Sequence, residues 1–355
     1  MIFLNLLKNL GKYMQNKFLI IAVFVLLLAS GFFLVKYQNN LSIKNYVKDT
    51  NIIWSDEWES ATINDEPTML SIFPGSEFSF TFTDAKSIGF RVNTDDIENS
   101  TILFITIDGK TYALSNPNIN DKRLSIVIPE SKRKFKHEVN AKMYCIVGVS
   151  TCKVNISEIF LEEGSIITSE KKSEKKTIGI LGDSLSLIEL QNNYSASLAD
   201  SFGYHLHNAS YWGGTIGTDK GKFAAVSRYK KDLVKYKPDI VIIFLGINDV
   251  HYSSSPELFR RDYNQIVKGI KKDLPKTRIL AVSILPGKDL DVNNDEIVAF
   301  NSIIKEIAQE QKINYVDATN WLNPDDYADQ LHPNYKGEGS LAVKLRTYLI
   351  DHNIK

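Results

Sequence analysis

The segment 177–186, TIGILGDSLS, constrains the fold more than any other part of the chain. Its first five residues are apolar or β-branched apart from one glycine, and sequence compatible with a helix follows Ser184. The pattern predicts a buried strand that turns sharply into a helix. Such a turn places Ser184 at the carboxyl edge of a parallel sheet, with its N–H near a helix N-terminus, where negative charge is stabilised. We therefore expect a nucleophile at Ser184.

Strand-like and helical patterns alternate from residue 177 to residue 355. The strand-like runs cover residues 177–181, 204–210, 239–245, 278–285 and 313–317. The clearest helical patterns cover residues 256–273 and 295–311. This alternation predicts an α/β catalytic domain at 177–355, built on a five-stranded, doubly wound parallel sheet with helices on both faces. Functional sites gather at the carboxyl ends of the strands in such sheets.

Three further polar blocks fall where loops should follow strands. They are Gly213-Gly214-Thr215, Gly246-Ile247-Asn248-Asp249 and the segment 329–333, DQLHP. Together with Gly182-Asp183-Ser184-Leu185, in this order and spacing, these blocks resemble those of the SGNH (GDSL) hydrolase superfamily. The resemblance covers roughly residues 177–355, about half of the chain. It implies a flavodoxin-like fold and a serine ester hydrolase, with acyl transfer as a possible variant of the reaction.

The resemblance assigns His332 as the base and Asp329 as its partner. A neutral imidazole takes the proton from Ser184 as the hydroxyl attacks an acyl carbon, and then returns it to the leaving alcohol. Asp329 stands three residues before His332, and a turn brings both onto one face, so the carboxylate can hold the imidazole tautomer. We expect Ser184, Asp329 and His332 to form the catalytic group.

Attack on an ester creates an oxyanion that needs hydrogen-bond donors already in place. The resemblance supplies three donors: the backbone N–H of Ser184, the backbone N–H of Gly213 and the side-chain amide of Asn248. Gly214 is the alternative to Gly213, because the two glycines are adjacent.

Other polar and aromatic residues of these blocks are expected to support the site. Asp183 and Asp249 are interpreted as acids that brace the loops. Trp212, beside the glycines, is expected to line the acyl or sugar pocket. Serine–histidine chemistry needs no cofactor, and the sequence holds no clustered metal ligands, so we expect neither a cofactor nor a metal.

Residues 18–35, FLIIAVFVLLLASGFFLV, form an apolar run without a charge. As a helix this run spans about 27 Å, close to the roughly 30 Å of a hydrocarbon core. Three lysines and no acid stand just before it, Lys8, Lys12 and Lys17. The pattern predicts a single-pass signal anchor with a cytoplasmic segment 1–17 and an extracytoplasmic catalytic domain. A cleaved signal peptide is the alternative, with small residues at 29–31.

Residues 41–162 change to short runs with a period of two. The candidate strands cover residues 69–73, 77–83, 87–92, 101–107, 124–129, 143–147 and 154–161. Asp108-Gly109 is a strong hairpin signal. These features predict an antiparallel β-sandwich or jelly roll, followed by a polar linker at 163–176.

The layout of a sandwich before the SGNH part is similar to that of carbohydrate esterase family two and of some cell-wall polysaccharide acetylesterases. Trp54 and Trp58 either pack in the sandwich core or stack on sugar rings. Cys145 and Cys152, the only cysteines, either form a disulfide or remain free thiols, and two are too few for a structural metal site.

The formal net charge is zero, which argues against nucleic acid as a partner. The leading hypothesis is an extracytoplasmic, membrane-tethered serine esterase that removes a short acyl group, acetyl foremost, from a cell-wall or surface carbohydrate. An O-acetyltransferase for polysaccharide or peptidoglycan would use the same catalytic residues. A lipase or thioesterase, or an inactive glycan-binding protein, completes the alternatives.

Overall fold

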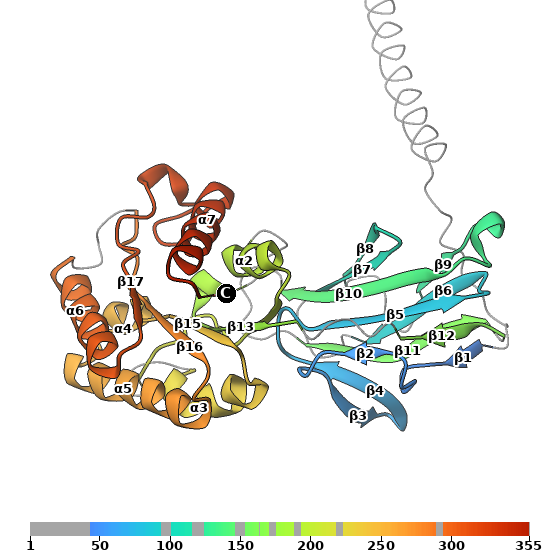
Figure 1. Cartoon of the computed structure of the whole chain (residues 1–355), viewed down its shortest axis with the longest axis horizontal. Helices are drawn as coiled ribbons and strands as arrows, with labels where there is room; N and C mark the ends of the chain where they lie inside the picture. Colours follow the sequence, from blue (N-terminus) through green and yellow to red (C-terminus); the bar gives the residue numbers. More distant parts are fainter. Residues whose placement is uncertain are drawn as a thin grey trace, which may run out of the picture.

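The computed structural model describes residues 43–93, 101–115, 124–145, 153–162, 164–169, 175–187, 193–217, 223–288 and 294–354. Two antiparallel sheets are followed by an α/β domain, and the two parts lie side by side (Figure 1). The predicted anchor at 18–35 and the segment 1–17 lie outside the described residues. Within the described ranges, no helix combines the length and the apolar character needed to cross a bilayer.

The N-terminal part is a sandwich of two antiparallel sheets. Sheet A has the order β3-β4-β11-β6-β9, with β1 beside β11, and sheet B has the order β12-β5-β10-β7-β8, with β2 beside β5. The strands are β1 (Ile43–Asn45), β2 (Ile53–Trp54), β3 (Glu59–Ile63), β4 (Glu66–Ser71), β5 (Glu77–Thr83), β6 (Ser87–Asn93), β7 (Thr101–Ile107), β8 (Lys110–Ser115), β9 (Leu124–Val127), β10 (His137–Cys145), β11 (Val154–Glu162) and β12 (Ile166–Thr168). The antiparallel fold predicted for this region is confirmed.

Alternating apolar residues of both sheets meet in one core. Phe78, Phe80 and Phe82 from β5 are buried against Ile88 and Phe90 from β6. This period of two is what a strand with one buried face requires. The alternation of apolar and polar residues in the sequence therefore indicates which face of each strand lies in the sandwich core.

The details of the sandwich refine the predicted boundaries. The predicted hairpin forms at Asp108 and Gly109, which both have positive φ values of 50° and 80°, as a type I′ turn demands. Strand β10 begins at His137, six residues before the predicted start. Strand β12 pairs with β5 inside the predicted linker 163–176, so the sandwich extends past Glu162.

The two tryptophans near the start of the sandwich contact its core. Trp58 is buried, and its ring lies edge-on to Trp54 at 5.0 Å between centroids. Trp58 also packs against Phe78. Core packing is therefore the role of Trp58, while Trp54 is only partly buried. Cys152 lies outside the described residues, so the pairing of the two cysteines stays a prediction.

The α/β domain contains the predicted five-stranded parallel sheet, sheet C, in the order β14-β13-β15-β16-β17. This is the flavodoxin-like strand order. The strands are β13 (Thr177–Gly182), β14 (His205–Asn208), β15 (Ile240–Phe244), β16 (Arg278–Val282) and β17 (Asn314–Val316). The helices are α2 (Tyr194–Phe202), α3 (Ala225–Asp232), α4 (Ile247–His251), α5 (Pro256–Asp273), α6 (Asn294–Gln311) and α7 (Tyr335–Asp351).

Helices cover both faces of sheet C. Ile178 and Ile180 of β13 belong to an apolar cluster with α2 and α7, whereas Leu181 belongs to a second cluster with α3, α5 and α6. The side chains of one strand alternate between the two clusters, because successive residues of a strand point to opposite faces. Sheet C is therefore buried on both sides, and its polar residues collect at the strand ends.

A buried ionic cluster joins the sandwich to the α/β domain. Oε1 of Glu57 lies 2.8 Å from Nε2 of His205 and 2.8 Å from Nδ1 of His207. Burial raises the pKa of Glu57, but hydrogen bonds to the two imidazoles and their charges outweigh it and hold that pKa well below its usual range. At the edge of this contact Lys142 pairs with Asp200 at 3.1 Å.

The two parts approach each other closely at Gly75. Its φ is +95°, and a Cβ at this position would lie 2.6 Å from the carbonyl oxygen of Leu206 on β14. No side chain fits this space without displacing backbone. The junction therefore requires glycine for two independent reasons, conformation and proximity.

Gly75→Ala should lower the free energy of unfolding by more than the roughly 1–3 kcal/mol of a strained left-handed residue, because the backbone of Leu206 must also shift. Urea denaturation of the full-length protein measures the loss. Gly109→Ala is the matched control, since φ is +80° there but no atom lies within 4 Å of an added Cβ. If both variants lose the same free energy of unfolding, the close approach of Gly75 to Leu206 does not add to the cost of the substitution.

The Glu57 cluster should make stability depend on pH. Burial lowers the pKa of His205, but hydrogen bonds to Glu57 and Glu77 outweigh it and raise that pKa from 6.5 to about 9. Because the raised value belongs to the folded state, the stabilisation is complete below about pH 6.5 and is lost as the pH rises through about 9. Urea titrations should show this decline, and His205→Gln should flatten it. If the free energy of unfolding of His205→Gln falls with pH as steeply as that of the wild type, other titratable groups cause the decline.

Candidate active site

Ser184 stands at the predicted strand–turn–helix junction. Strand β13 ends at Gly182, and Ser184 opens the short 3₁₀ helix Ser184–Ser186. Asp183 caps this helix by accepting a hydrogen bond from the N–H of Leu185 at 3.0 Å. A Cβ on Gly182 would lie 2.5 Å from Cβ of Ser186, so only glycine permits so sharp a turn. The turn leaves Ser184 7% exposed at the carboxyl edge of sheet C.

The structure brings together the three residues assigned to catalysis. Nε2 of His332 lies 3.0 Å from Oγ of Ser184, and Nδ1 lies 2.8 Å from Oδ2 of Asp329. Both separations are hydrogen-bond distances, and the imidazole lies between a hydroxyl and a carboxylate. The arrangement can move a proton from Ser184 to His332 while Asp329 holds the ring.

The main chain fixes the orientation of Asp329. Its Oδ1 accepts the N–H of Leu331 at 2.7 Å and the N–H of His332 at 2.6 Å. Partial burial raises the pKa of Asp329, but these two donors and the imidazole outweigh it and lower that pKa. The carboxylate therefore stays charged and directed at His332, although the side chain is 57% exposed.

The three predicted oxyanion donors follow neighbouring strands. Ser184, Gly213 and Asn248 come after β13, β14 and β15, which are adjacent in sheet C, and Asn248 lies in the first turn of α4. Nδ2 of Asn248 donates to the carbonyl of Gly214 at 3.0 Å, and this bond ties α4 to the glycine loop. The N–H of Gly214 already donates to the carbonyl of Tyr211 at 3.0 Å. The geometry therefore favours Gly213 over Gly214 as the donor.

The two acids interpreted as loop braces are buried and bind backbone N–H groups. Asp249 accepts from Ile216 at 2.8 Å and from Gly217 at 3.2 Å, which fixes the loop that contains Gly213. Burial, together with the nearby charge of Asp249, raises the pKa of Asp183 to about 7. Neither carboxylate is hydrogen-bonded to Ser184 or His332 in the described part of the chain, which fits a supporting role.

Trp212 contacts the base directly. Its ring stacks on the imidazole of His332 with centroids 5.0 Å apart and planes 22° apart. The indole is partly buried and also packs against the sandwich core. The sequence placed Trp212 beside the site, but only the fold shows that it touches His332.

Arg228 supports the glycine loop and was not found from the sequence. Its guanidinium donates to the carbonyls of Ala209 at 2.6 Å and Phe223 at 2.9 Å, and it lies over the ring of Tyr211 at 4.3 Å. Two of these three contacts reach back across the glycine loop to the end of β14, so the sequence pattern around Arg228 does not signal them. Among the described residues, no cluster of three or more His, Cys, Asp or Glu side chains is arranged to hold a metal ion.

The chain is similar to known proteins in both sequence and structure. Residues 180–339 match the GDSL-like Lipase/Acylhydrolase family. An acetylxylan esterase of Xylanibacter ruminicola is 28% identical over 168 residues, which cover 37% of this chain and 34% of that protein. The match thus spans about a third of the relative's length.

Two solved structures share the whole architecture. A family two carbohydrate esterase from Cellvibrio japonicus has a TM-score of 0.69 at 16% identity, covering 87% of this chain and 97% of its own. A family two carbohydrate esterase from Clostridium thermocellum, solved with cellohexaose, has a TM-score of 0.68 at 15% identity, covering 85% and 99%. At such identities the likeness shows the fold, including the sandwich before the α/β domain.

Residues 180–339 therefore match a GDSL-like acylhydrolase domain. The prediction of an SGNH-type serine ester hydrolase is confirmed at the level of this domain. The predicted similarity to the layout of carbohydrate esterase family two is confirmed as a similarity of fold.

Trp212→Ala should impair the reaction in two separable ways. Loss of the ring that His332 packs on should lower kcat for a small acetyl ester by about 10-fold to 100-fold, because the base is less well positioned. Loss of a pocket wall should raise KM for a sugar ester more than for the small ester. Steady-state kinetics measure both, with Trp212→Phe expected to retain most of kcat. Unchanged kinetics in Trp212→Ala would remove this residue from the site.

Proposed function

We propose that this protein is a carbohydrate esterase that removes a short acyl group, acetyl foremost, from an acylated polysaccharide. The observation that carries the proposal is the hydrogen-bonded series Ser184, His332 and Asp329 at the carboxyl edge of sheet C. The domain family supports ester hydrolysis. The names of the relatives, an acetylxylan esterase and family two carbohydrate esterases, support a carbohydrate ester as the substrate.

The reaction proceeds in two steps. Oγ of Ser184 attacks the acyl carbon while Nε2 of His332 takes the hydroxyl proton, and the oxyanion is stabilised by the donors at Ser184, Gly213 and Asn248. His332 then gives that proton to the sugar oxygen, the ester bond breaks, and an acyl-enzyme remains. Water attacks this ester with His332 again as base, which releases the carboxylic acid and restores Ser184.

We place this activity outside the cytoplasm, on a protein tethered to the membrane through residues 18–35. The support is the apolar run and the three lysines before it. The substrate would then be a cell-wall or surface polysaccharide. An O-acetyltransferase shares every catalytic residue and differs only in whether water or a sugar hydroxyl attacks the acyl-enzyme.

The test incubates full-length protein with acetylated xylan or a chromogenic acetyl ester, with and without an oligosaccharide acceptor. Ser184→Ala should lower the release of acetate by at least about 10³-fold, because the nucleophile is lost. Ser227→Ala, on the exposed face of α3, is the matched control and should leave the rate unchanged. Acetate release and acceptor acetylation are measured together.

Free acetate that does not change with the acceptor supports the esterase. Acetylated oligosaccharide formed at the expense of acetate identifies a transferase, and a preference for long acyl chains identifies a lipase or thioesterase. If the wild type and Ser184→Ala are equally inert toward all of these esters, the proposal is contradicted. The remaining hypothesis is then an inactive glycan-binding protein.

A further inference from the structure

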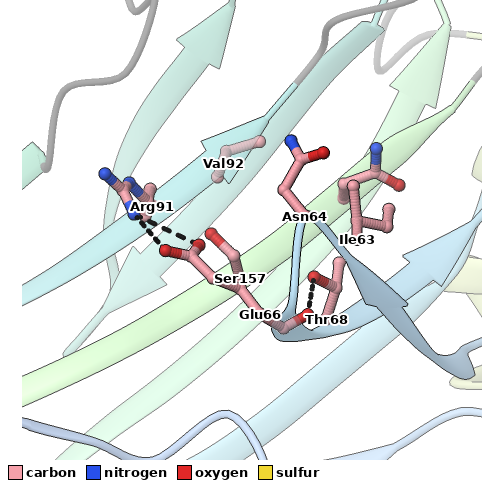
Figure 2. A pocket seen from close by; sticks show the side chains of 8 residues that line it. Ile63, Asn64, Glu66, Thr68, Arg91, Val92 and Ser157 are labelled. Carbon is pink, nitrogen blue, oxygen red and sulfur yellow. Dashed lines mark hydrogen bonds and ion pairs between the residues drawn. The ribbon is translucent and has the colours of Figure 1, made fainter.

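A small pocket lies on the sandwich, apart from the catalytic residues. It sits between the hairpin of β3 and β4 and the outer face of β6 and β11, with a cavity volume of about 240 Å³ (Figure 2). Asn64 and Asp65 form the hairpin turn with φ values of 51° and 64°. We name it the hairpin pocket. It shares no lining residue with the group around Ser184.

Asn155 lines the hairpin pocket, and one polar atom of its side chain has no partner in the described part of the protein. The residue is 4% exposed, and its Oδ1 has no hydrogen-bond partner among the residues that the structure describes. Its neighbours Val154 and Ile156 point into the sandwich core, so Asn155 points away from it. A buried amide oxygen without a partner costs about 1–3 kcal/mol, which an apolar side chain would avoid. A ligand group that bonds to this amide would offset the cost.

A β-bulge adds a second polar group. The register of β11 against β6 shifts between Ile156 and Glu158, so Ser157 is the extra residue of the bulge. The bulge turns Ser157 and Glu158 to the same outer face, where regular alternation would have buried one of them. Ser157 lines the pocket, and Glu158 lies 3.6 Å from Arg91.

Arg91 and Glu66 form the polar wall of the pocket. Nη1 of Arg91 donates to both carboxylate oxygens of Glu66, at 3.1 and 3.2 Å, as the dashed lines of Figure 2 show. An adjacent donor and acceptor complement two neighbouring hydroxyls, since each hydroxyl can donate one bond and accept another. With Glu66 and Glu158 beside Arg91, no positive charge is left over for an anion.

The remaining walls fit the carbon face of a sugar ring. Ile63 supplies aliphatic surface beside the polar groups, whereas the side chain of Val92, which also borders the pocket, packs against the sandwich core. The volume is below the roughly 300–1,000 Å³ of sites for drug-sized ligands, so the pocket holds one small ring. Asn64 from the hairpin turn and Thr68 from β4 add an amide and a hydroxyl.

We propose that the hairpin pocket binds one neutral glycosyl residue through its vicinal hydroxyls, with the buried amide of Asn155 as the anchor. The proposal rests on the proposed function in its choice of ligand, because the same polysaccharide would supply both the ester and the bound residue. The pocket then holds the polymer at a second point while Ser184 acts on an acyl group elsewhere.

Asn155→Leu separates this role from a structural one. Leucine has a similar volume and removes the unpartnered amide, so Tm should stay the same or rise. Calorimetric titration of full-length protein with xylohexaose and cellohexaose should then show one saccharide fewer bound per chain, or a loss of affinity of at least 10-fold. Asn140→Leu, in β10 of the other sheet, is the matched control and should bind as the wild type does.

Ser157→Ala is the second variant and should weaken binding severalfold, even if Asn155→Leu fails to fold. Hydrolysis of a small chromogenic ester should be unchanged in both variants. The proposal is overturned if both variants bind saccharide with the stoichiometry and affinity of the wild type. It is also overturned if the variants lose activity on the small ester to the same extent as they lose saccharide binding. Saccharide binding is measured whether or not the wild type hydrolyses esters, so failure of the pocket and failure of the esterase are distinguishable.

Discussion

The parallel pairing of β13 with β14 on one side and β15 on the other sets the positions of Ser184, Gly213 and Asn248, the nucleophile and the proposed oxyanion donors. Parallel strands end at the same edge, so the loops after these three strands meet there. Ser184, Gly213 and Asn248 directly follow these strands, Asn248 in the first turn of α4, and His332 reaches Ser184 from the segment before α7. The hydrogen bonds of Asp249 and Asn248 then tie the loops to one another.

The contact between the sandwich and the α/β domain depends on charge that is buried and paired. Glu57 is 3% exposed and would be costly to bury alone, but two imidazoles share its Oε1. Removing one partner of such a cluster costs more than the cluster contributes, because a charge is then left without compensation. Around it, Phe73 packs against His207 and Tyr236. The apolar and ionic contacts together hold β14, the strand that carries the glycine loop, against the sandwich.

Local patterns in the sequence predicted the strands and the catalytic blocks because both depend on short spacing. Strand β13 and Ser184 are encoded within ten residues, and Asp329 and His332 within four. The start of β10 was missed because its outward residues Glu138, Asn140 and Lys142 make the segment read as polar. Strand β12 was missed because it lies among charged residues and forms only by pairing with β5.

Contacts between distant segments could not be predicted in the same way. The stacking of Trp212 on His332 joins residues 120 positions apart in the sequence. The hairpin pocket requires the turn at Asn64 to fold over β11, and its bulge at Ser157 is a change of register that no residue type signals alone. The residue types in the sequence indicated candidate site residues. The pairing of the strands determines which of these residues contact one another.

The fit at Gly75 has a consequence for how such a chain can evolve. An α/β domain cut out at residue 177 would expose the imidazole of His207 and the ring of Tyr236, both of which are now covered by Phe73. It would also take from Trp212 part of the apolar surface on which it rests. An exchange of either part should therefore preserve these contacts, and a substitution on one side of the contact should require a compensating substitution on the other.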